Sequence, residues 1–411
     1  MASDTAPSIA LLAQDAFVRP SGIARYQAEL VTHLAGRTNL HLLIVHPSHV
    51  KAAHGALPAP MNEAHLLHYT APSAVLRNAP AIARGFLAHP EFFDWNPMVF
   101  LNVVSSRLFT GAAIDRAGFD LVHGTSSYLP TTAGRTARVI TVHDTTPLSM
   151  PERHTRNTVK CFVRPSEIRQ DDEVIADTQS GLNEVLAVVD HPPENSHVVH
   201  LGIDRAVFHP PAPGTSPPRS PYILSVGTIE PRKNLVRALA AFELLRKDHK
   251  DLRWKLAGQR GWGWNEFARS IAASPARGSV DILGPVPDPE LADLYRGALA
   301  FLFPTLWEGF GIPVLEALAC GTPVAASKLP AIEEIGGGHF FPIEPESVES
   351  IAEATSRAAF DGNGREARRD ASAAHAATFD WRSVAERTLD VYAKALGRPR
   401  DELLAASSAK Q

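Results

Sequence analysis

Short runs of apolar residues alternate with amphipathic stretches along most of this chain. The apolar runs, which have the length of strands, lie at residues 9–13, 42–45, 121–123, 139–142, 174–176, 222–226, 253–256, 280–283, 299–303 and 324–326. Stretches such as 23–35, 235–246 and 290–297 carry apolar residues at helical spacing between them. Fully apolar strands that alternate with helices are typical of parallel sheets with helices on both faces. We therefore predict a doubly wound α/β fold.

A proline-rich segment at residues 209–221 interrupts this alternation. Proline fixes φ and has no amide donor, so the segment can continue neither a helix nor a strand. A chain of 411 residues also exceeds what one hydrophobic core usually supports. We therefore predict two α/β domains, at residues 1–208 and 222–380, with a linker at 209–221. A last helical pattern and a polar, alanine-rich tail make up residues 381–411.

Composition and charge exclude several classes of protein. The net charge is -4, so no basic field favours nucleic acid as a partner. Cys161 and Cys320 are far apart and form no metal-type pattern with histidine, so we expect no metal site and no disulfide. The N-terminus does not resemble a secretory signal, and no apolar run reaches the roughly 18 residues of a membrane span. These features predict a cytoplasmic protein.

The string Glu308-Gly-Phe-Gly-Ile-Pro-Val-Leu-Glu316 follows the predicted strand at 299–303. Pro313 suits a first helical turn because its missing amide would have no partner there, and Gly321 suits the end of that helix. Glu308 is then expected on a loop and Glu316 on the first turns of the helix. Free amides at a helix start can hold phosphate, and carboxylates accept hydrogen bonds from sugar hydroxyls. The amides concerned belong to Gly309, Phe310, Gly311 and Ile312.

A second candidate element is Val226-Gly-Thr-Ile-Glu-Pro-Arg-Lys-Asn234, between a predicted strand and a predicted helix. Asn234 is a favourable N-cap residue, which would place Arg232 and Lys233 just before the helix start. Two cations there could bind a diphosphate and offset the charge that builds on it as a leaving group. The alternative is an ordinary solvated basic pair.

Two candidates lie in the first half of the chain. Gly22 opens a predicted helix, where a glycine lets the backbone approach a ligand and the helix start favours an anion, although a simple tight turn would look the same. The glycine pattern of dinucleotide-binding enzymes is incomplete here, which disfavours a dehydrogenase. His143 follows the strand at 139–142, at the edge where open α/β sheets bind ligands. The alternative for His143 is a hydrogen-bonded structural residue.

These strings resemble a known family. The segment from Glu308 to Glu316, continued by Cys320-Gly-Thr-Pro-Val-Ala-Ala-Ser327, resembles the E-x7-E signature of retaining, nucleotide-sugar-dependent glycosyltransferases of family 4, also called glycosyl transferases group 1. The Gly-Thr-Ile-Glu-Pro-Arg-Lys-Asn string resembles that family's phosphate element. Many members have an arginine where this chain has Thr228, which leaves Lys233 as the firmer ligand and Arg232 to be judged from geometry. Ala176-Asp-Thr-Gln-Ser180 resembles the family's Ser-x-x-Ser element.

The resemblance, which extends over residues 20–330, implies the GT-B fold: two Rossmann-like domains facing an interdomain cleft, with a C-terminal helix crossing back to the first. It implies that the Gly22 loop faces the donor diphosphate, and that Arg232, Lys233 and residues 309–312 bind the donor. Glu316 would bind the ribose hydroxyls. His143 and Glu308 would act at the transferred sugar, His143 through its ring or through its backbone carbonyl. The leaving phosphate could take the acceptor's proton, so neither a metal nor a cofactor is expected.

The strings look most like bacterial mannosyltransferases of lipopolysaccharide and other surface polysaccharide assembly. They imply transfer of mannose from GDP-mannose to a saccharide or lipid-linked saccharide. A basic stripe and an aromatic region at 86–109 could dock such an acceptor at the inner face of the membrane, or could be a solvated helix face and part of the core. The stripe consists of Arg153, Arg156, Lys160 and Arg164.

Other functions remain open on sequence alone. A nucleotide-sugar epimerase or a phosphorylase could use the same fold, the first without an acceptor and the second with free phosphate. A two-lobed sugar-binding protein would bind ligand without turnover.

Overall fold

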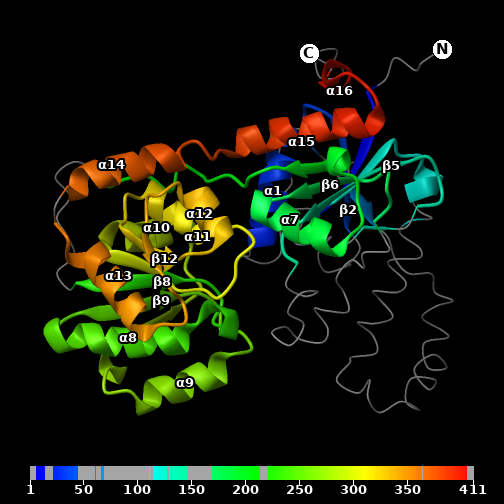
Figure 1. Cartoon of the computed structure of the whole chain (residues 1–411). Helices are drawn as coiled ribbons and strands as arrows, with labels where there is room; N and C mark the ends of the chain where they lie inside the picture. The colour runs from blue at the N-terminus through cyan, green and yellow to red at the C-terminus, as the bar shows by residue number, and fades with distance from the viewer. Residues whose placement is uncertain are drawn as a thin grey trace, which may run out of the picture. The chain divides into compact units, whose positions relative to one another are not determined.

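The computed structural model describes residues 6–13, 22–44, 61, 66–68, 111, 114–126, 129–130, 132–145, 168–212, 221–362 and 364–404. The chain divides into two compact units. Unit 1 comprises Met1–Asp177, Gly181–Val199 and Trp381–Gln411, and unit 2 comprises Thr178–Ser180 and His200–Asp380. Each unit contains a parallel sheet with helices packed around it (Figure 1). The predicted doubly wound α/β fold is confirmed.

Within the described residues, the sheet of unit 1 has seven parallel strands in the order β3-β2-β1-β4-β5-β6-β7. The strands are β1 (Ser8–Leu12), β2 (Asn39–Ile44), β3 (Leu66–His68), β4 (Leu121–Gly124), β5 (Ala137–Val142), β6 (Glu173–Ala176) and β7 (Ser196–Val198). The helices are α1 (Gly22–Leu34), α7 (Gln179–Val188), the 3-10 turn η5 (Pro193–Asn195), α15 (Trp381–Leu396) and α16 (Arg400–Leu404). The strand order reverses between β1 and β4, which defines a switch point where ligands bind in such sheets.

The described sheet of unit 2 has six parallel strands in the order β10-β9-β8-β11-β12-β13. They are β8 (Tyr222–Val226), β9 (Arg253–Ala257), β10 (Val280–Gly284), β11 (Ala300–Phe303), β12 (Val324–Ser327) and β13 (Phe341–Ile343). The helices are η6 (Pro231–Lys233), α8 (Leu235–Asp248), α9 (Trp264–Ala273), η7 (Arg277–Ser279), α10 (Asp288–Gly297), α11 (Ile312–Ala319), α12 (Pro330–Gly336), α13 (Val348–Phe360) and α14 (Arg365–Ala376).

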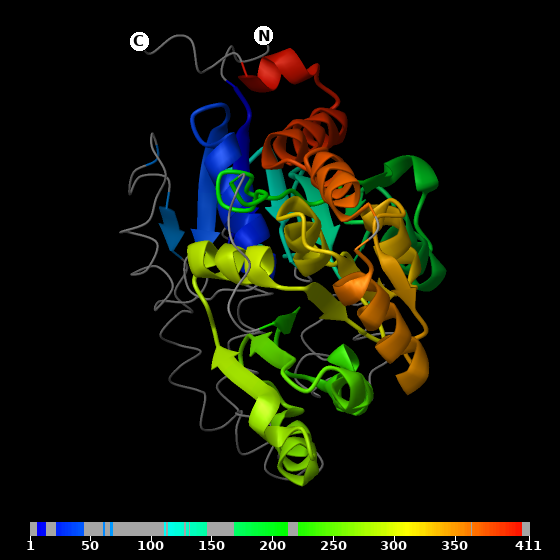
Figure 2. The ribbon, with the colours of Figure 1, turned by 90° about the vertical axis from the view of Figure 1, so that its left-hand side faces the viewer.

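The strands of unit 2 lie between two helix layers. One layer contains α8, α9 and α13, and the other contains α10, α11, α12 and α14 (Figure 1), while Figure 2 shows the same unit from the side. The central strands β8 and β11 consist of apolar residues except for Ser225, because both of their faces are covered by helices, and the buried Ser225 hydroxyl donates to the carbonyl of Leu302. This burial fixes the strand ends, where the loops with the candidate residues begin.

The boundary between the units differs from the predicted one. Unit 2 begins at His200, before the proline-rich segment 209–221, whose described residues 209–212 belong to unit 2. Residues 200–210 are held there by the hydrogen bond of Ile203 N to Phe379 O (3.1 Å), by the packing of the Phe208 and Tyr295 rings (6.1 Å), and by bonds from Arg296 to the carbonyls of Val207 and His209. The second unit therefore starts at residue 200, before the predicted boundary at 208, because prolines end regular elements without separating compact units.

The C-terminal segment from Trp381 belongs to unit 1, the placement that the family resemblance implied. Helix α15 packs on α1, β4 and β5. Its Lys394 ammonium reaches the carboxylate of Glu173 at 3.1 Å, and its Tyr392 hydroxyl bonds to His123 at 2.7 Å. The second unit thus ends at Asp380 and the chain completes the first unit afterwards.

No helix among the described residues is long and apolar enough to cross a membrane. The basic stripe at 153–164 and the region 86–109 lie outside the described residues.

Candidate active site

The loop after β8 brings the predicted phosphate element to the carboxyl edge of the sheet in unit 2. Gly227 adopts φ 136°, and a Cβ there would lie 3.3 Å from Cε of Lys233. Gly258, at the end of β9, adopts φ 148°, and a Cβ there would lie 2.0 Å from the carbonyl oxygen of Gly227. Both positions favour glycine because of their positive φ, and at Gly258 the backbone of Gly227 also leaves no room for a side chain. The close approach holds Lys233 across the end of β8.

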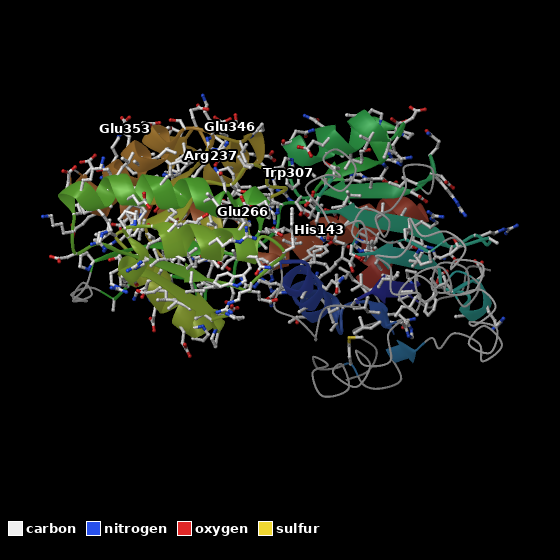
Figure 3. All side chains as sticks on the ribbon, turned by 90° about the horizontal axis from the view of Figure 1, so that it is seen from below. His143, Arg237, Glu266, Trp307, Glu346 and Glu353 are labelled. Carbon is white, nitrogen blue, oxygen red and sulfur yellow. The ribbon has the colours of Figure 1, made fainter. Side chains whose placement is uncertain are left out.

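Asn234 occupies the N-cap position of α8, as predicted, so Arg232 and Lys233 precede the helix start. It adopts φ 58°, however, and its side chain does not make the expected cap hydrogen bond. Its side-chain amide instead donates to the carbonyls of Pro304 (3.0 Å) and Pro345 (2.6 Å), and its oxygen accepts from Arg237 (3.1 Å), which is labelled in Figure 3. Asn234 thus ties the phosphate element to the loop after β11, a long-range role that the local sequence pattern could not reveal.

Three predicted residues meet in one ionic cluster. Nζ of Lys233 and Nη1 of Arg232 lie 2.5 Å and 2.7 Å from the same oxygen, Oε1 of Glu308. Thr305 donates its hydroxyl to that oxygen at 3.1 Å. Nε of Arg232 also lies 2.6 Å from Glu230, and its Nη1 donates to the carbonyl of Trp307 at 3.2 Å. The cluster therefore fixes two cations beside two carboxylates in a largely buried loop.

Burial and charge shift the pKa values inside this cluster. Burial, the largest influence, acts to raise the pKa of Glu308, but the charges of Arg232 and Lys233 and the hydrogen bonds from Lys233 and Thr305 outweigh it, so the pKa lies below its ordinary value. The pKa of Lys233 is also lowered, because burial and the charge of Arg232 outweigh the attraction of Glu308. Glu308 is consequently an ionised carboxylate and a weak base.

The shifted pKa of Glu308 predicts how stability depends on pH. A carboxylate whose folded pKa is lowered stabilises the protein above its unfolded pKa, and this contribution disappears as pH falls through the folded pKa. We expect Glu308→Gln to be less stable than the wild type near neutral pH, with the difference in Tm shrinking as the pH falls below the ordinary pKa of a glutamate. Thermal unfolding across this range measures it, with the exposed Glu353→Gln as control. A difference that stays constant with pH would contradict the expectation.

The backbone amides at the start of α11 belong to residues 309–312, which directly follow Glu308 of the ionic cluster in the sequence. Gly311 precedes the helix, Pro313 lies in its first turn, and Gly321 follows its end with φ 71°, as predicted. The amides of residues 309–312 donate no hydrogen bond within the part of the chain that the structure describes. The Gly309 carbonyl accepts a bond from Thr178 (3.0 Å), which orients the loop. Such amides at a helix start form a site for anions.

Glu316 lies in a different environment from Glu308. It is on α11 with 2% of its surface exposed, and its Oε2 accepts a hydrogen bond from the Tyr295 hydroxyl at 2.9 Å. Tyr295 is itself fully buried on α10. The two glutamates of the E-x7-E string are therefore held by separate sets of neighbours, Glu308 by cations and Glu316 by a phenol.

In unit 1, His143 follows β5 at the carboxyl edge of the sheet (Figure 3). Its Nδ1 lies 2.8 Å from Oδ2 of Asp177, and its Nε2 lies 3.2 Å from the carbonyl oxygen of Thr125. Asp177 follows β6 and Thr125 follows β4, so three adjacent strand ends meet at the imidazole. The Tyr26 ring packs edge-on against it, with centroids 4.7 Å apart.

The pKa of His143 is raised above its ordinary value. Burial, the largest influence, acts to lower it, but the charge and hydrogen bond of Asp177, the Thr125 carbonyl and the charge of Asp144 outweigh burial. The nearby His123 behaves oppositely, since burial and the charge of His143 lower its pKa to about 3. The pKa values of the two histidines are therefore shifted in opposite directions, that of His143 toward the charged form and that of His123 toward the neutral form.

Gly22 is the first residue of α1 and is exposed. The residues before it, 14–21, lie outside the described part of the chain.

Several residues at these positions were missed by the sequence analysis. They are Asp177, Thr125 and Tyr26 around His143, Thr305 beside Glu308, and Tyr295 beside Glu316. Asp177 and His143 each directly follow a predicted strand, and that shared position is the signal that could have linked them. The other contacts depend on which helices and strands are neighbours, which the sequence pattern does not specify.

Solved structures share the fold of this chain. Sucrose-phosphate synthase from Thermosynechococcus elongatus matches with a TM-score of 0.68 at 17% identity, over 95% of this chain and 99% of that one. HepE of Anabaena, solved in complex with UDP and glucose, matches with a TM-score of 0.64 at 15% identity, over 94% of this chain and 100% of that one. The chain therefore has the GT-B fold of glycosyltransferases.

The sequence comparisons identify the family. Residues 211–375 match the family described as glycosyl transferases group 1. The O-antigen chain mannosyltransferase B of Escherichia coli is 27% identical over 392 residues, which are 90% of this chain and 96% of that protein. Residues 211–375 therefore belong to the glycosyl transferases group 1, and the chain as a whole is similar to a mannosyltransferase of this kind.

Proposed function

We propose that the chain is a retaining glycosyltransferase that moves a hexose from a nucleotide diphosphate sugar to a saccharide or lipid-linked saccharide in surface polysaccharide biosynthesis. The observation that carries the proposal is the ionic cluster of Arg232, Lys233 and Glu308 together with the unbonded amides of residues 309–312. Cations and amides are the groups that bind a diphosphate, and a glycosyltransferase needs them to stabilise the leaving group.

Arg232 takes the place of the arginine that many family members have at the position of Thr228. Thr228 is exposed, whereas the Arg232 guanidinium is held by Glu230 and Glu308. A guanidinium fixed by two carboxylates loses little freedom when it binds a phosphate. We propose that Arg232 and Lys233 neutralise the departing diphosphate without the help of a metal.

Glu308 acts in this proposal as a ligand of the donor sugar. Its Oε1 is occupied by the cations, and its Oε2 has no hydrogen-bond partner among the described residues. The free oxygen can accept a bond from a sugar hydroxyl. The lowered pKa of Glu308 makes it a poor general base, so the leaving phosphate is the better acceptor for the proton of the attacking hydroxyl.

His143 acts through its backbone carbonyl. Both ring nitrogens already bond to acceptors, Asp177 and Thr125, whereas the carbonyl of His143 accepts no bond from the described residues. A carbonyl dipole can stabilise the positive charge that develops on the transferred sugar. Of the two roles open to His143, the geometry therefore favours the backbone one.

Glu316 binds the ribose of the nucleotide, because a buried carboxylate held by Tyr295 gives hydroxyls a fixed, desolvated acceptor. Mannose is the proposed sugar and GDP-mannose the proposed donor. The name of the similar O-antigen mannosyltransferase supports mannose as the sugar. The choice of guanine as the nucleotide base is supported only by the resemblance of the sequence strings.

A thermal-shift panel of GDP, UDP, ADP and their sugars tests this proposal. We expect GDP and GDP-mannose to raise the Tm of the wild type, by an amount equivalent to about 2.7 kcal/mol at a hundred times the Kd. Glu316→Ala should lose most of that shift. Glu353→Ala, which removes an exposed carboxylate on α13 (Figure 3), should keep it.

The outcomes separate the alternatives. If no nucleotide stabilises the wild type, the proposal fails. A new sugar nucleotide formed without any acceptor would indicate an epimerase, and turnover that requires free phosphate would indicate a phosphorylase. Stabilisation by a sugar nucleotide without any product, whichever acceptor is added, would indicate a binding protein.

A further inference from the structure

Asp177 is buried at the end of β6 and faces His143. Only 3% of its surface is exposed, and its Oδ2 lies 2.8 Å from Nδ1 of His143. Its other oxygen, Oδ1, is buried with no hydrogen-bond partner among the described residues. A buried carboxylate with half of its acceptor capacity unused is costly, and the cost is offset only if its partner is positively charged.

The opposite side of the imidazole is fixed as well. Nε2 of His143 lies 3.2 Å from the carbonyl oxygen of Thr125, which can only accept a hydrogen bond. The Thr125 hydroxyl in turn donates to the carbonyl of Leu12 at the end of β1, so the backbone of Thr125 is held in place. An imidazole that bonds to an acceptor at each nitrogen needs a proton on both, which is the imidazolium form.

The other titratable groups around His143 do not keep its ring in the imidazolium form. His123 on β4 is neutral and bonds to Tyr392 and Thr141. Tyr26 on α1 bonds to Thr141 at 2.9 Å, and burial raises its pKa well above the ordinary value. The charge of Asp144 also raises the pKa of His143, but by less than the charge and the hydrogen bond of Asp177 do. Asp177 is therefore the group that determines the protonation of His143.

We propose that Asp177 is a positioning residue that holds His143 doubly protonated and bridged between the ends of β4 and β6. Held in this way, the ring takes no part in proton transfer, its charge favours an anionic donor, and the backbone at residue 143 keeps one conformation. This inference rests on the proposed function, since it assumes that the positive charge of His143 lies beside the transferred sugar and its anionic donor. Neither the histidine nor the aspartate is expected to act as a base.

The test compares Asp177→Asn with Asp177→Glu and with Asp171→Asn, which removes an exposed carboxylate just before β6. NMR titration of the His143 imidazole in the full chain, assigned by the signal lost in His143→Gln, should show a pKa lower by about one to three units in Asp177→Asn. The pH above which kcat declines should fall together with this pKa in Asp177→Asn. Just above that lowered pH limit, the kcat of Asp177→Asn should be about tenfold or more below that of the wild type. Asp177→Glu should restore part of the shift, and Asp171→Asn should behave as the wild type.

Two results would overturn the assignment: an unchanged His143 titration in Asp177→Asn, or a changed titration with an unmoved pH profile of kcat. If Asp177→Asn does not fold, Asp177→Ser removes the same charge and gives the same comparison. Nucleotide binding to the wild type is measured separately by thermal shift and needs no turnover. Its absence would refute the proposed glycosyltransferase function and leave the His143 titration as an independent result.

Discussion

Lys233→Met should lower kcat/KM by about a thousandfold, because a preorganised donor to a developing anion contributes two to three orders of magnitude and this one is charged. The lysine is held by Glu308 at 2.5 Å and by the Phe303 ring, with its Nζ 4.6 Å from the ring centroid. Its low exposure strengthens its interaction with a phosphate, since water screens it little. Initial rates with donor and acceptor measure the effect.

The control is Lys255→Met. Lys255 lies on β9 over the Tyr222 ring at 3.9 Å, outside the ionic cluster, so its loss should change kcat/KM by no more than about twofold. Lys233→Met should also reduce the free energy of unfolding by about 1–3 kcal/mol, because Glu308 then keeps one cationic partner, Arg232, among the described residues. The double variant Lys233→Met/Glu308→Gln should recover part of that stability without recovering activity. Activity in Lys233→Met within tenfold of the wild type would remove Lys233 from the proposed mechanism.

Much of the fold and part of the site follow from the sequence for physical reasons. Central strands such as β8 and β11 are buried on both faces, so they are largely apolar and are visible as runs. The edge strands β3, β7 and β13 were not predicted, because each has only three residues and includes a serine, histidine or proline, which leaves no apolar run. The helix start at α11 was predicted from Pro313 and Gly321, whose backbone requirements are local.

What could not be predicted depends on contacts between distant residues. The pairing of His143 with Asp177 exists because β5 and β6 are neighbours, and the sequence specifies neither the strand order nor the register. The bonds of Asn234 to Pro304 and Pro345 replaced the helix cap that its local pattern favoured. The unit boundary likewise followed from packing of residues 200–210, which no proline signal could reveal.

Gly258→Ala should destabilise the protein by about 3–5 kcal/mol, which is rare for a change of one methyl group. The substitution combines a positive φ of 148° with a Cβ that would lie 2.0 Å from the carbonyl oxygen and 2.6 Å from the carbonyl carbon of Gly227. Neither neighbour can rotate away, because both atoms are backbone and the amide of Gly227 is bonded to the carbonyl of Ala257 at 2.9 Å. The strand ends must therefore separate.

Separation of these strand ends moves Gly227 relative to Lys233, so Gly258→Ala should also lose nucleotide-dependent stabilisation. Urea denaturation followed by tryptophan fluorescence measures the first effect, since Trp254 is fully buried in the core of unit 2. Gly278→Ala is the matched control: nothing lies within 4 Å of its Cβ, so its stability should stay within about 0.5 kcal/mol of the wild type. Equal stabilities for the two variants would mean that β8 and β9 do not meet at Gly227, and the support of Lys233 by these strand ends would then have to be abandoned.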